Sequence, residues 1–279
     1  MDMTDNPMTS RFSPRIAVDA IGKLIRNKED TAQVFRVLVA LRGQSFARNF
    51  RRFEASPLGA RVLANKEDLV DVLSDRGYLE TLPDGSLGRA FIAFLDGCNI
   101  SPQGLNDAAD EAGLSSHELP EDVQRYQSRI RVQHDLWHVI GGYGCDGFGE
   151  VCNLAFSYPH TRNIGMMLLA IVGAHKYAKV FQSEPVRRAM WEGYRRGKRA
   201  TWLPAVDWAA LMPRPLFDVQ RQLGVTDLPH SYNAAPKAIA ASGTMVEKIL
   251  ISGPDAIHNR IAVTPTLAKV VRKHMKTVP

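Results

Sequence analysis

Helical spacing of apolar residues runs through most of this chain and limits its fold more than any other feature. Apolar side chains recur every three or four positions, and no convincing segment alternates apolar and polar residues as a half-buried strand does. The sequence therefore predicts a mainly α fold. The expected helices cover residues 16–25, 31–41, 66–73, 87–95, 121–141, 148–159, 163–180, 184–202 and 216–223.

The two ends of the chain differ in character from its middle. With 279 residues and 45% hydrophobic composition, we expect a single helical domain over residues 15–228. Residues 1–14 predict a flexible N-terminal segment, and residues 229–279 predict a linker and a C-terminal tail with one or two short helices. The apolar run 164–174 is about half as long as a membrane-spanning helix, and no signal sequence is visible, so the cytoplasm is the expected location.

Cysteine content argues against a disulfide-bonded scaffold. The chain has three cysteines, Cys98, Cys145 and Cys152, and an odd number fits a reducing compartment better than a disulfide framework. An unpaired cysteine commonly packs as a small apolar residue. We therefore expect packing or incidental roles for Cys145 and Cys152 in preference to metal ligation.

The net charge of +6 does not by itself identify a partner. Residues 187–199 interleave Arg and Lys with Trp191 and Tyr194, which could stack on bases, but no recognised nucleic-acid motif accompanies them. This cluster predicts a helix that faces solvent or lipid headgroups, and we expect no nucleic-acid partner. Two other basic clusters lie at residues 42–52 and 269–276.

One segment combines a strong helix start with two histidines. Residues 120–122 (Pro-Glu-Asp) favour a helix N-terminus, because proline fits the first turn and acidic side chains complement the helix dipole. Apolar residues then follow three-four spacing from Val123 to Gly141, and His134 falls on that inward stripe. His138 lies four residues after His134, so the two imidazoles project from one face of the helix and can share one metal ion.

A carboxylate is expected to complete this metal site. Glu150 lies twelve residues after His138, beyond a glycine-rich break that lets the next helix fold back towards the histidines. Two histidines and one carboxylate with an open position are typical of a catalytic metal site. Asp146 is an alternative carboxylate ligand. Asp135 lies about 100° around the helix from His134, so it either reaches the ion obliquely or holds a ligand from behind.

Other kinds of chemistry receive less support from the sequence. Arg125, Arg129 and Arg131 precede the histidines and could clamp a carboxylate or phosphate, but solvation at the surface explains them equally well. The remaining histidines lack paired ligand spacing, and we expect them to be structural or exposed. The chain has no P-loop, no GxGxxG after a strand and no GxSxG, so nucleotide cofactors and an activated serine have no support.

The metal-site residues also resemble a known family. The stretch HDLWH at residues 134–138, then eleven residues, then Glu150 matches the HDxxH-x11-E signature of the COQ-four family of ubiquinone biosynthesis proteins. Residues 83–90 (PDGSLGRA) are similar to the family's PDGSLGRAY segment, and Arg125 with Tyr126 is similar to its RY(R) lead-in. The resemblance covers roughly residues 53–225.

The resemblance implies a mainly helical protein that associates with the inner face of the cell membrane and with other ubiquinone-synthesis enzymes. Its implied reaction is oxidative decarboxylation at ring carbon one of a polyprenyl-hydroxybenzoate, in which hydroxyl replaces carboxyl. By the same resemblance the metal ligands are His134, Asp135, His138 and Glu150, with zinc the expected ion and iron the alternative. An apolar helix at residues 164–174 would then shield the isoprenoid tail from water. A homo-oligomer is left open.

Two other functions remain open at this point. In the first, the protein is a non-catalytic lipid-binding scaffold whose metal ties two helices together while it organises a ubiquinone-synthesis complex. In the second, it is a zinc hydrolase, because HDxxH resembles the HExxH motif with its general-base acid. The hydrolase is disfavoured because Asp is one methylene shorter than Glu and because peptidase clefts normally contain strands, which the sequence does not predict.

Overall fold

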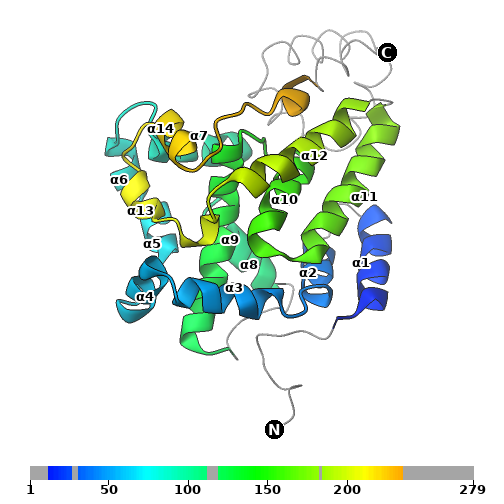
Figure 1. The fold of residues 1–279 in the computed structure, drawn as a ribbon, viewed down its shortest axis with the longest axis horizontal. Helices are drawn as coiled ribbons and strands as arrows, with labels where there is room; N and C mark the ends of the chain where they lie inside the picture. The colour runs from blue at the N-terminus through cyan, green and yellow to red at the C-terminus, as the bar shows by residue number, and fades with distance from the viewer. Residues whose placement is uncertain (1–11, 27–30, 112–118, 182–183, 235–279) are drawn as a thin grey trace.

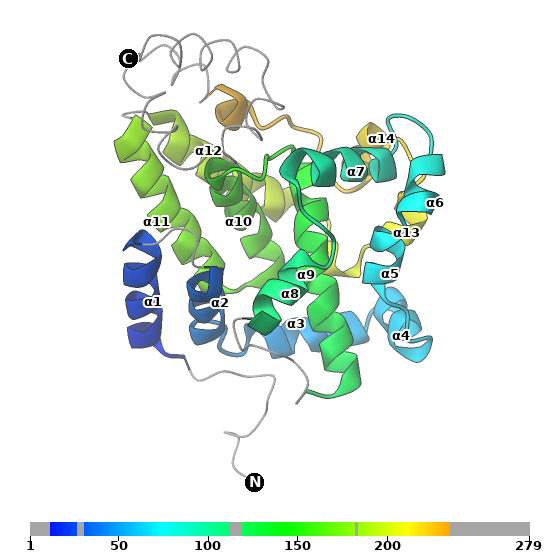
Figure 2. The ribbon, with the colours of Figure 1, turned by 180° about the vertical axis from the view of Figure 1, so that it is seen from behind.

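A long central helix, α9 (Glu121–Gly141), passes through the middle of the molecule, and the other helices surround it (Figures 1 and 2). Within the described part of the chain there are fourteen α-helices, one 3-10 helix and no strand, apart from an isolated bridge between Ser86 and Pro215. The predicted mainly α, single-domain fold is confirmed. The computed structural model describes residues 12–26, 31–111, 119–181 and 184–234.

In chain order, most helices before α9 are short, and the three helices directly after it are longer. Before it come α1 (Pro14–Arg26), α2 (Thr31–Ala40), α3 (Ser45–Glu54), α4 (Pro57–Ala64), α5 (Leu69–Ser74), α6 (Arg76–Thr81), α7 (Leu87–Cys98) and α8 (Gly104–Glu111). After it come α10 (Gly147–Thr161), α11 (Ile164–Phe181), α12 (Glu184–Arg199), η1 (Leu203–Ala205), α13 (Trp208–Leu211) and α14 (Leu216–Gln222).

The helices predicted from apolar spacing are present, and several of their ends differ: α5 begins at Leu69, three residues later than expected, and α7 continues three residues further, to Cys98. We expected Pro159 to end its helix, but α10 continues to Thr161, because a proline in the last turn removes only one hydrogen bond. Arg162, in the left-handed conformation, then caps the helix. The helix expected to reach Trp202 ends at Arg199. Trp202 turns out of the helical path, and its indole N–H donates to the backbone carbonyl of His160 at 2.9 Å.

Five short helices, α3, α4, α6, α8 and α13, were not predicted. The clearest case is α3, which lies in the basic cluster at residues 42–52. Its arginines face solvent while Ala47, Phe50 and Phe53 are buried on the other side. Phe50 and Phe53 pack against Tyr126 of α9 with ring centroids 5.6 and 5.0 Å apart. The charge of the segment hid an amphipathic helix that covers the first half of α9.

Helices α10, α11 and α12 pack against one another and form one side of the molecule (Figure 1). Gly193 and Gly197 let α12 approach α10 closely. A Cβ atom at these positions would lie 2.6 Å from the carbonyl oxygen of Cys152 and 2.0 Å from that of Phe156, respectively. Larger residues would push the two helices apart, so these glycines set how deeply the side chains of α12 reach into the core.

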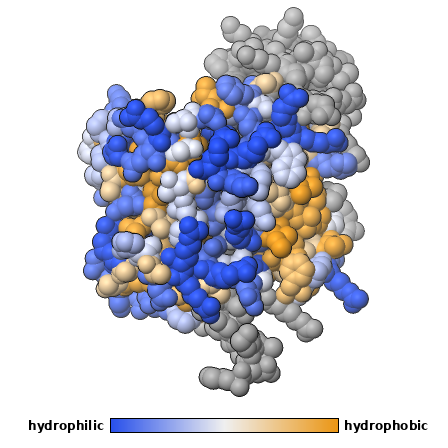
Figure 3. Space-filling view, viewed as in Figure 1, coloured by the Kyte–Doolittle hydropathy of each residue, from blue (hydrophilic) through white to orange (hydrophobic). Residues whose placement is uncertain are grey.

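Helices α1 and α11 each carry exposed large apolar residues. The two helices lie at the same edge of the molecule in both ribbon views, and their buried faces share a core with α2 (Figures 1 and 2). Apolar side chains gather on this side in the space-filling view (Figure 3). No helix in the described residues is both long and apolar enough to cross a membrane. The large apolar side chains exposed on the two helices are Ile16, Val18, Ile164 and Ile171.

The packing or incidental role expected for Cys145 is wrong, because this residue forms a disulfide. Cys98, the last residue of α7, is bonded to Cys145 in the loop between α9 and α10. The two cysteines are 47 residues apart in sequence, and packing of α7 beside α9 brings them together. Spacing along the chain carries no sign of that approach. Cys152 is free and buried, in agreement with the packing role expected for it.

Some predictions concern residues that the structure does not describe. The N-terminal segment up to residue 11 lies outside the described residues, as does the tail from residue 235 onward, where one or two short helices were expected. The basic cluster at residues 269–276 lies there too. The boundaries proposed for the helical domain, residues 15–228, therefore remain a prediction at both ends.

Candidate metal centre

The turn between α9 and α10 is built from residues with special backbone roles. Gly142 caps α9 in the left-handed conformation, with φ 71°. Asp146 caps α10, and its carboxylate accepts hydrogen bonds from the backbone N–H groups of Phe148 and Gly149. A Cβ atom at Gly149 would lie 1.8 Å from the carbonyl oxygen of Gly144, so only glycine allows this close crossing of the loop and the helix. The turn brings the start of α10 against the last turns of α9.

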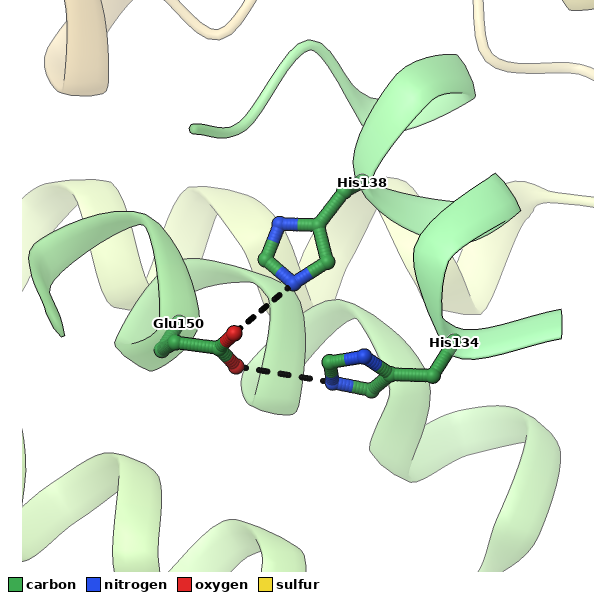
Figure 4. A group of neighbouring side chains, drawn as sticks. All are labelled: His134, His138 and Glu150. Carbon is green, nitrogen blue, oxygen red and sulfur yellow. Dashed lines mark ion pairs between the residues drawn. The ribbon is translucent and has the colours of Figure 1, made fainter. Parts of the chain in front are cut away.

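Three of the four predicted ligands meet at this turn. His134 and His138 project from α9, and the carboxylate of Glu150, from the first turn of α10, faces both of their rings (Figure 4). One donor atom from each of the three lies within 4.8 Å of the others. Glu150 Oε1 is 3.2 Å from His138 Nε2, and Glu150 Oε2 is 3.4 Å from His134 Nε2. The arrangement offers two imidazole nitrogens and one carboxylate to a single point.

The other two acidic candidates do not join this group. Asp135 is buried, and its Oδ1 lies 3.4 Å from His134 Nδ1, on the side of the ring away from Glu150. The structure thus places Asp135 where it can hold a ligand from behind, one of the two roles expected for it. Asp146 caps α10 with Oδ1, and its Oδ2 lies 3.3 Å from the hydroxyl of Tyr232. It therefore does not compete with Glu150.

Hydrogen bonds fix which nitrogen of each histidine faces Glu150. His138 Nδ1 lies 3.3 Å from the backbone carbonyl of Tyr143, and a carbonyl only accepts, so Nδ1 carries the proton. The ring of His138 also stacks on Phe94 of α7, with centroids 5.3 Å apart. In the same way the Asp135 carboxylate calls for a proton on His134 Nδ1. When either ring is neutral, it therefore turns the lone pair of Nε2 towards the carboxylate.

With these tautomers, hydrogen-bond acceptors face one another: the Nε2 lone pairs of the histidines and the carboxylate oxygens of Glu150. His138 Nε2 is fully buried and makes no hydrogen bond, although Glu150 Oε1 lies only 3.2 Å away. A lone pair on nitrogen and a carboxylate oxygen repel at that distance unless a proton or a metal cation lies between them. The donor set therefore fits a divalent metal ion, and two histidines with one carboxylate suit both zinc and ferrous iron.

The closeness of the histidines and the carboxylates also shifts the pKa values of His134 and Glu150. Burial alone would lower the pKa of His134, but the carboxylates of Glu150 and Asp135 outweigh it and raise this pKa far above its ordinary value. Burial alone would raise the pKa of Glu150, but His138 and His134 lower it below its ordinary value. Without a metal, His134 thus holds a proton that balances the negative charge of the carboxylates.

The centre is closed on one side and open on the other. His138 is buried, with 1% of its side chain exposed, whereas 39% of the Glu150 side chain and 16% of that of His134 are exposed. An ion held here would be reached from the side of Glu150. A position left open to a substrate or water distinguishes catalytic from structural metal sites.

The arginines and histidines that the sequence raised as further candidates lie away from the three ligands. Arg129 is buried and donates to the carbonyl oxygens of Pro204 and Val206, so surface solvation does not describe it. Arg125 lies among surface charges and pairs with Glu121. His160 is buried and accepts a hydrogen bond from the backbone N–H of Leu203, a structural role as expected.

Sequence reasoning missed the residues that hold His138. Phe94 belongs to a different helix, and the carbonyl of Tyr143 acts through the backbone, which residue type does not reveal. The prediction that the basic cluster on α12 faces solvent or lipid is wrong for Arg196, which is 2% exposed. The sequence did contain a sign that this helix is partly buried. Two glycines four residues apart, Gly193 and Gly197, indicate close helix packing on either side of Arg196.

Comparison with known proteins identifies the family of this chain. Residues 38–229 match the family model described as coenzyme Q (ubiquinone) biosynthesis protein Coq4. The mitochondrial ubiquinone biosynthesis protein COQ4 of Podospora anserina is 26% identical over 176 residues, which cover 61% of this chain and 54% of that protein. The Caenorhabditis elegans protein coq-4, also named mitochondrial, is 28% identical over 182 residues, 64% of this chain and 74% of that protein.

A solved structure supports the fold independently of these relatives. A crystal structure from Nostoc punctiforme, described as a putative ubiquinone biosynthesis protein, matches with a TM-score of 0.53 and 19% identity. The match covers 78% of this chain and all of that one. At this identity the likeness concerns the fold alone. The present chain spans little more than half the length of the fungal relatives, 54% and 57% of the first two.

Proposed function

This chain belongs to the family of coenzyme Q (ubiquinone) biosynthesis proteins Coq4, and on that premise we propose that it acts on a polyprenyl-hydroxybenzoate precursor of ubiquinone. The proposed reaction is metal-dependent oxidative decarboxylation, which replaces the carboxyl group at ring carbon one by hydroxyl. The observation that carries the proposal is the buried Nε2 of His138, which makes no hydrogen bond and faces Glu150 Oε1 across 3.2 Å. Such a pair calls for a cation at the open end of the α9–α10 turn.

The side chains around the turn have distinct tasks in this proposal. His134, His138 and Glu150 hold the ion, with zinc as the expected metal and iron as the alternative. Asp135 holds the ring of His134 through Nδ1, and the carbonyl of Tyr143 holds the ring of His138 in the same way. This division differs from the predicted ligand set only in giving Asp135 the orienting role.

The chemistry of the reaction limits what else is needed. A bound divalent cation supplies Lewis acidity towards a ring carboxylate or phenolate. Exchange of carboxyl for hydroxyl, with loss of carbon dioxide, removes two electrons from the substrate. Dioxygen is the proposed oxidant, and with one water molecule taken up the reaction balances when dioxygen is reduced by these two electrons to hydrogen peroxide. The exposed edges of Glu150 and His134 leave the ring of the substrate a way in, while His138 stays shielded by Phe94.

The lipid character of the substrate accounts for the apolar surface. We propose that the protein binds a membrane surface peripherally through α1 and α11, whose exposed apolar residues include Ile16, Val18, Ile164 and Ile171. A polyprenyl chain needs shielding from water, and an apolar helix face at the membrane can supply it. The inner face of the cell membrane is the location expected from the sequence, whereas the compared relatives are named mitochondrial. Other ubiquinone-synthesis enzymes are the proposed protein partners.

The deciding experiment combines metal analysis with turnover. Purified wild type, Glu150→Gln and His138→Ala are analysed for bound metal and then incubated with a prenylated 4-hydroxybenzoate carrying a ¹³C-labelled carboxyl, with and without oxygen. We expect near-stoichiometric metal and oxygen-dependent release of labelled carbon dioxide in wild type, and loss of both in the two variants. Exposed residues with no link to the centre provide the controls Glu54→Gln and His230→Ala, which should behave as wild type.

The outcomes separate the proposal from the scaffold alternative. Bound metal without release of labelled carbon dioxide would reject the enzyme and favour the scaffold. If wild type is prepared without chelators and supplied with zinc or iron but still contains no metal, the metal centre itself is rejected. Wild-type metal content in Glu150→Gln would remove Glu150 from the ligand set.

A further inference from the structure

Arg196 of α12 is a buried cation in an unusual position. Only 2% of the residue is exposed, and among the described residues no carboxylate pairs with it. Its Nη1 instead donates to the backbone carbonyl of Gly141 at 2.7 Å and to the hydroxyl of Tyr143 at 2.6 Å. Gly141 is the last residue of α9, where the free carbonyl groups carry partial negative charge. The end of the histidine-bearing helix thus serves as the counter-charge.

The position of Arg196 is set by the packing of α12. Gly193 and Gly197 flank it on the same helix and bring the backbone of α12 against the carbonyls of α10. That close approach lets the guanidinium pass α10 and reach the end of α9. Burying an unpaired guanidinium is costly, so a residue that only filled space here would be better replaced by an apolar one. The position calls for an explanation beyond packing.

Tyr143 links Arg196 to the metal centre. Its backbone N–H donates to the carbonyl of His138 at 3.0 Å, while its own carbonyl accepts from His138 Nδ1 at 3.3 Å. Its ring folds back over Gly141, where a Cβ atom would lie 2.7 Å from the ring carbon Cδ2. Contacts with Tyr232 and Phe156 fix the other faces of the ring. Tyr143 is therefore held at both ends, by Arg196 at the hydroxyl and by His138 at the backbone.

We propose that Arg196 is a positioning residue for the metal centre, acting through Tyr143 to aim Nε2 of His138 at the point shared with Glu150. This inference rests on the metal site of the proposed function and adds a residue from a third helix to it. The path runs from the guanidinium to the Tyr143 hydroxyl, through that residue to its carbonyl, and on to Nδ1 of His138. Hydrogen bonds to the far nitrogen of a ligand histidine set its tautomer and orientation.

The test measures metal binding and the state of His138 without turnover. Cobalt(II) is titrated into wild type, Arg196→Gln, Arg196→Lys and Tyr143→Phe, and its visible absorption reports the ligand geometry. We expect the cobalt affinity of Arg196→Gln and Tyr143→Phe to fall about tenfold or more, with altered absorption bands. Arg196→Lys keeps the charge and one donor and should recover part of the affinity.

Two matched controls separate positioning from general destabilisation. Arg129 is as buried as Arg196 and likewise donates to backbone carbonyls, but at η1 and the following loop, so Arg129→Gln should lose stability and keep wild-type cobalt affinity. Tyr126 is a buried tyrosine on α9 remote from the turn, so Tyr126→Phe is the control for Tyr143→Phe. Circular dichroism confirms that each variant compared is folded.

The result that overturns the inference differs from the one that overturns the proposed function. Wild-type affinity and absorption in folded Tyr143→Phe and Arg196→Gln would remove Arg196 from the centre and leave the metal site intact. If wild type binds no metal, the proposed function fails, and NMR of ¹⁵N-labelled histidine in the metal-free proteins decides the inference. Unchanged His138 ring signals in both variants would then overturn it, and a changed Nδ1 signal would support it.

Discussion

Gly149→Ala tests whether the close crossing between the loop and α10 sets the position of Glu150. The new Cβ atom would lie 1.8 Å from the carbonyl oxygen of Gly144, whereas real Cβ contacts essentially never fall below 3.0 Å. The two backbones must therefore separate by about 1.2 Å, several times the roughly 0.2 Å within which metal–ligand distances are normally held. The backbone dihedrals of Gly149 suit any residue, because its φ is not positive. Any effect of the substitution therefore comes from the clash between the new Cβ atom and the carbonyl oxygen of Gly144, and not from backbone strain.

The expected result is a loss of metal affinity with the fold retained. Since Glu150 is the next residue, moving the start of α10 takes its carboxylate away from His134 and His138, and we expect cobalt(II) or zinc affinity to fall roughly 10–100-fold. Competition with a chromophoric chelator measures the affinity, and circular dichroism measures helix content. Gly97→Ala is the matched control, because no atom lies within 4 Å of its Cβ position in α7. Wild-type affinity in folded Gly149→Ala would refute the reasoning.

Three further predictions concern the cysteines and the core. Burial raises the pKa of Cys152 well above its ordinary value, so little thiolate forms near neutral pH, and iodoacetamide should leave this residue unmodified in the native protein. In the unfolded protein, iodoacetamide should label one thiol without reductant and three thiols after reduction of the disulfide. Replacing Cys98 and Cys145 by serine should lower the free energy of unfolding by about 4 kcal/mol, the chain-entropy value for a loop of this length, and urea denaturation checks it. Leu136→Ala, at a fully buried position of α9 between the two histidines, should cost about 2–5 kcal/mol in the same assay.

The sequence predicted the parts of the site that depend on local helix geometry. His134 and His138 share a face because they are four residues apart, and the glycines between Gly141 and Gly149 allowed Glu150 to fold back. The role of Asp135 stayed open for a physical reason. A residue one step along a helix projects about 100° away, and only the rotamers of the folded protein decide whether it meets the ion or the neighbouring ring.

The features that the sequence did not predict join segments far apart in the chain. The bond between Cys98 and Cys145 depends on α7 lying beside α9, and the contact of Arg196 with Tyr143 depends on α12 packing against α10. Charge was misleading in both basic clusters. In α3 it concealed a buried face with Phe50 and Phe53, and in α12 it concealed an arginine whose counter-charge is a helix end.

The hairpin of α9 and α10 also sets the order in which the chain can acquire its metal site. All three ligands lie between residues 134 and 150, and the turn that joins them is capped by its own glycine and aspartate. Closing so short a loop costs little entropy, and such local contacts form early in folding. During synthesis the ligands can therefore meet before α12 has left the ribosome. Arg196 then arrives at a centre that the hairpin has already closed, and it restrains that centre instead of creating it.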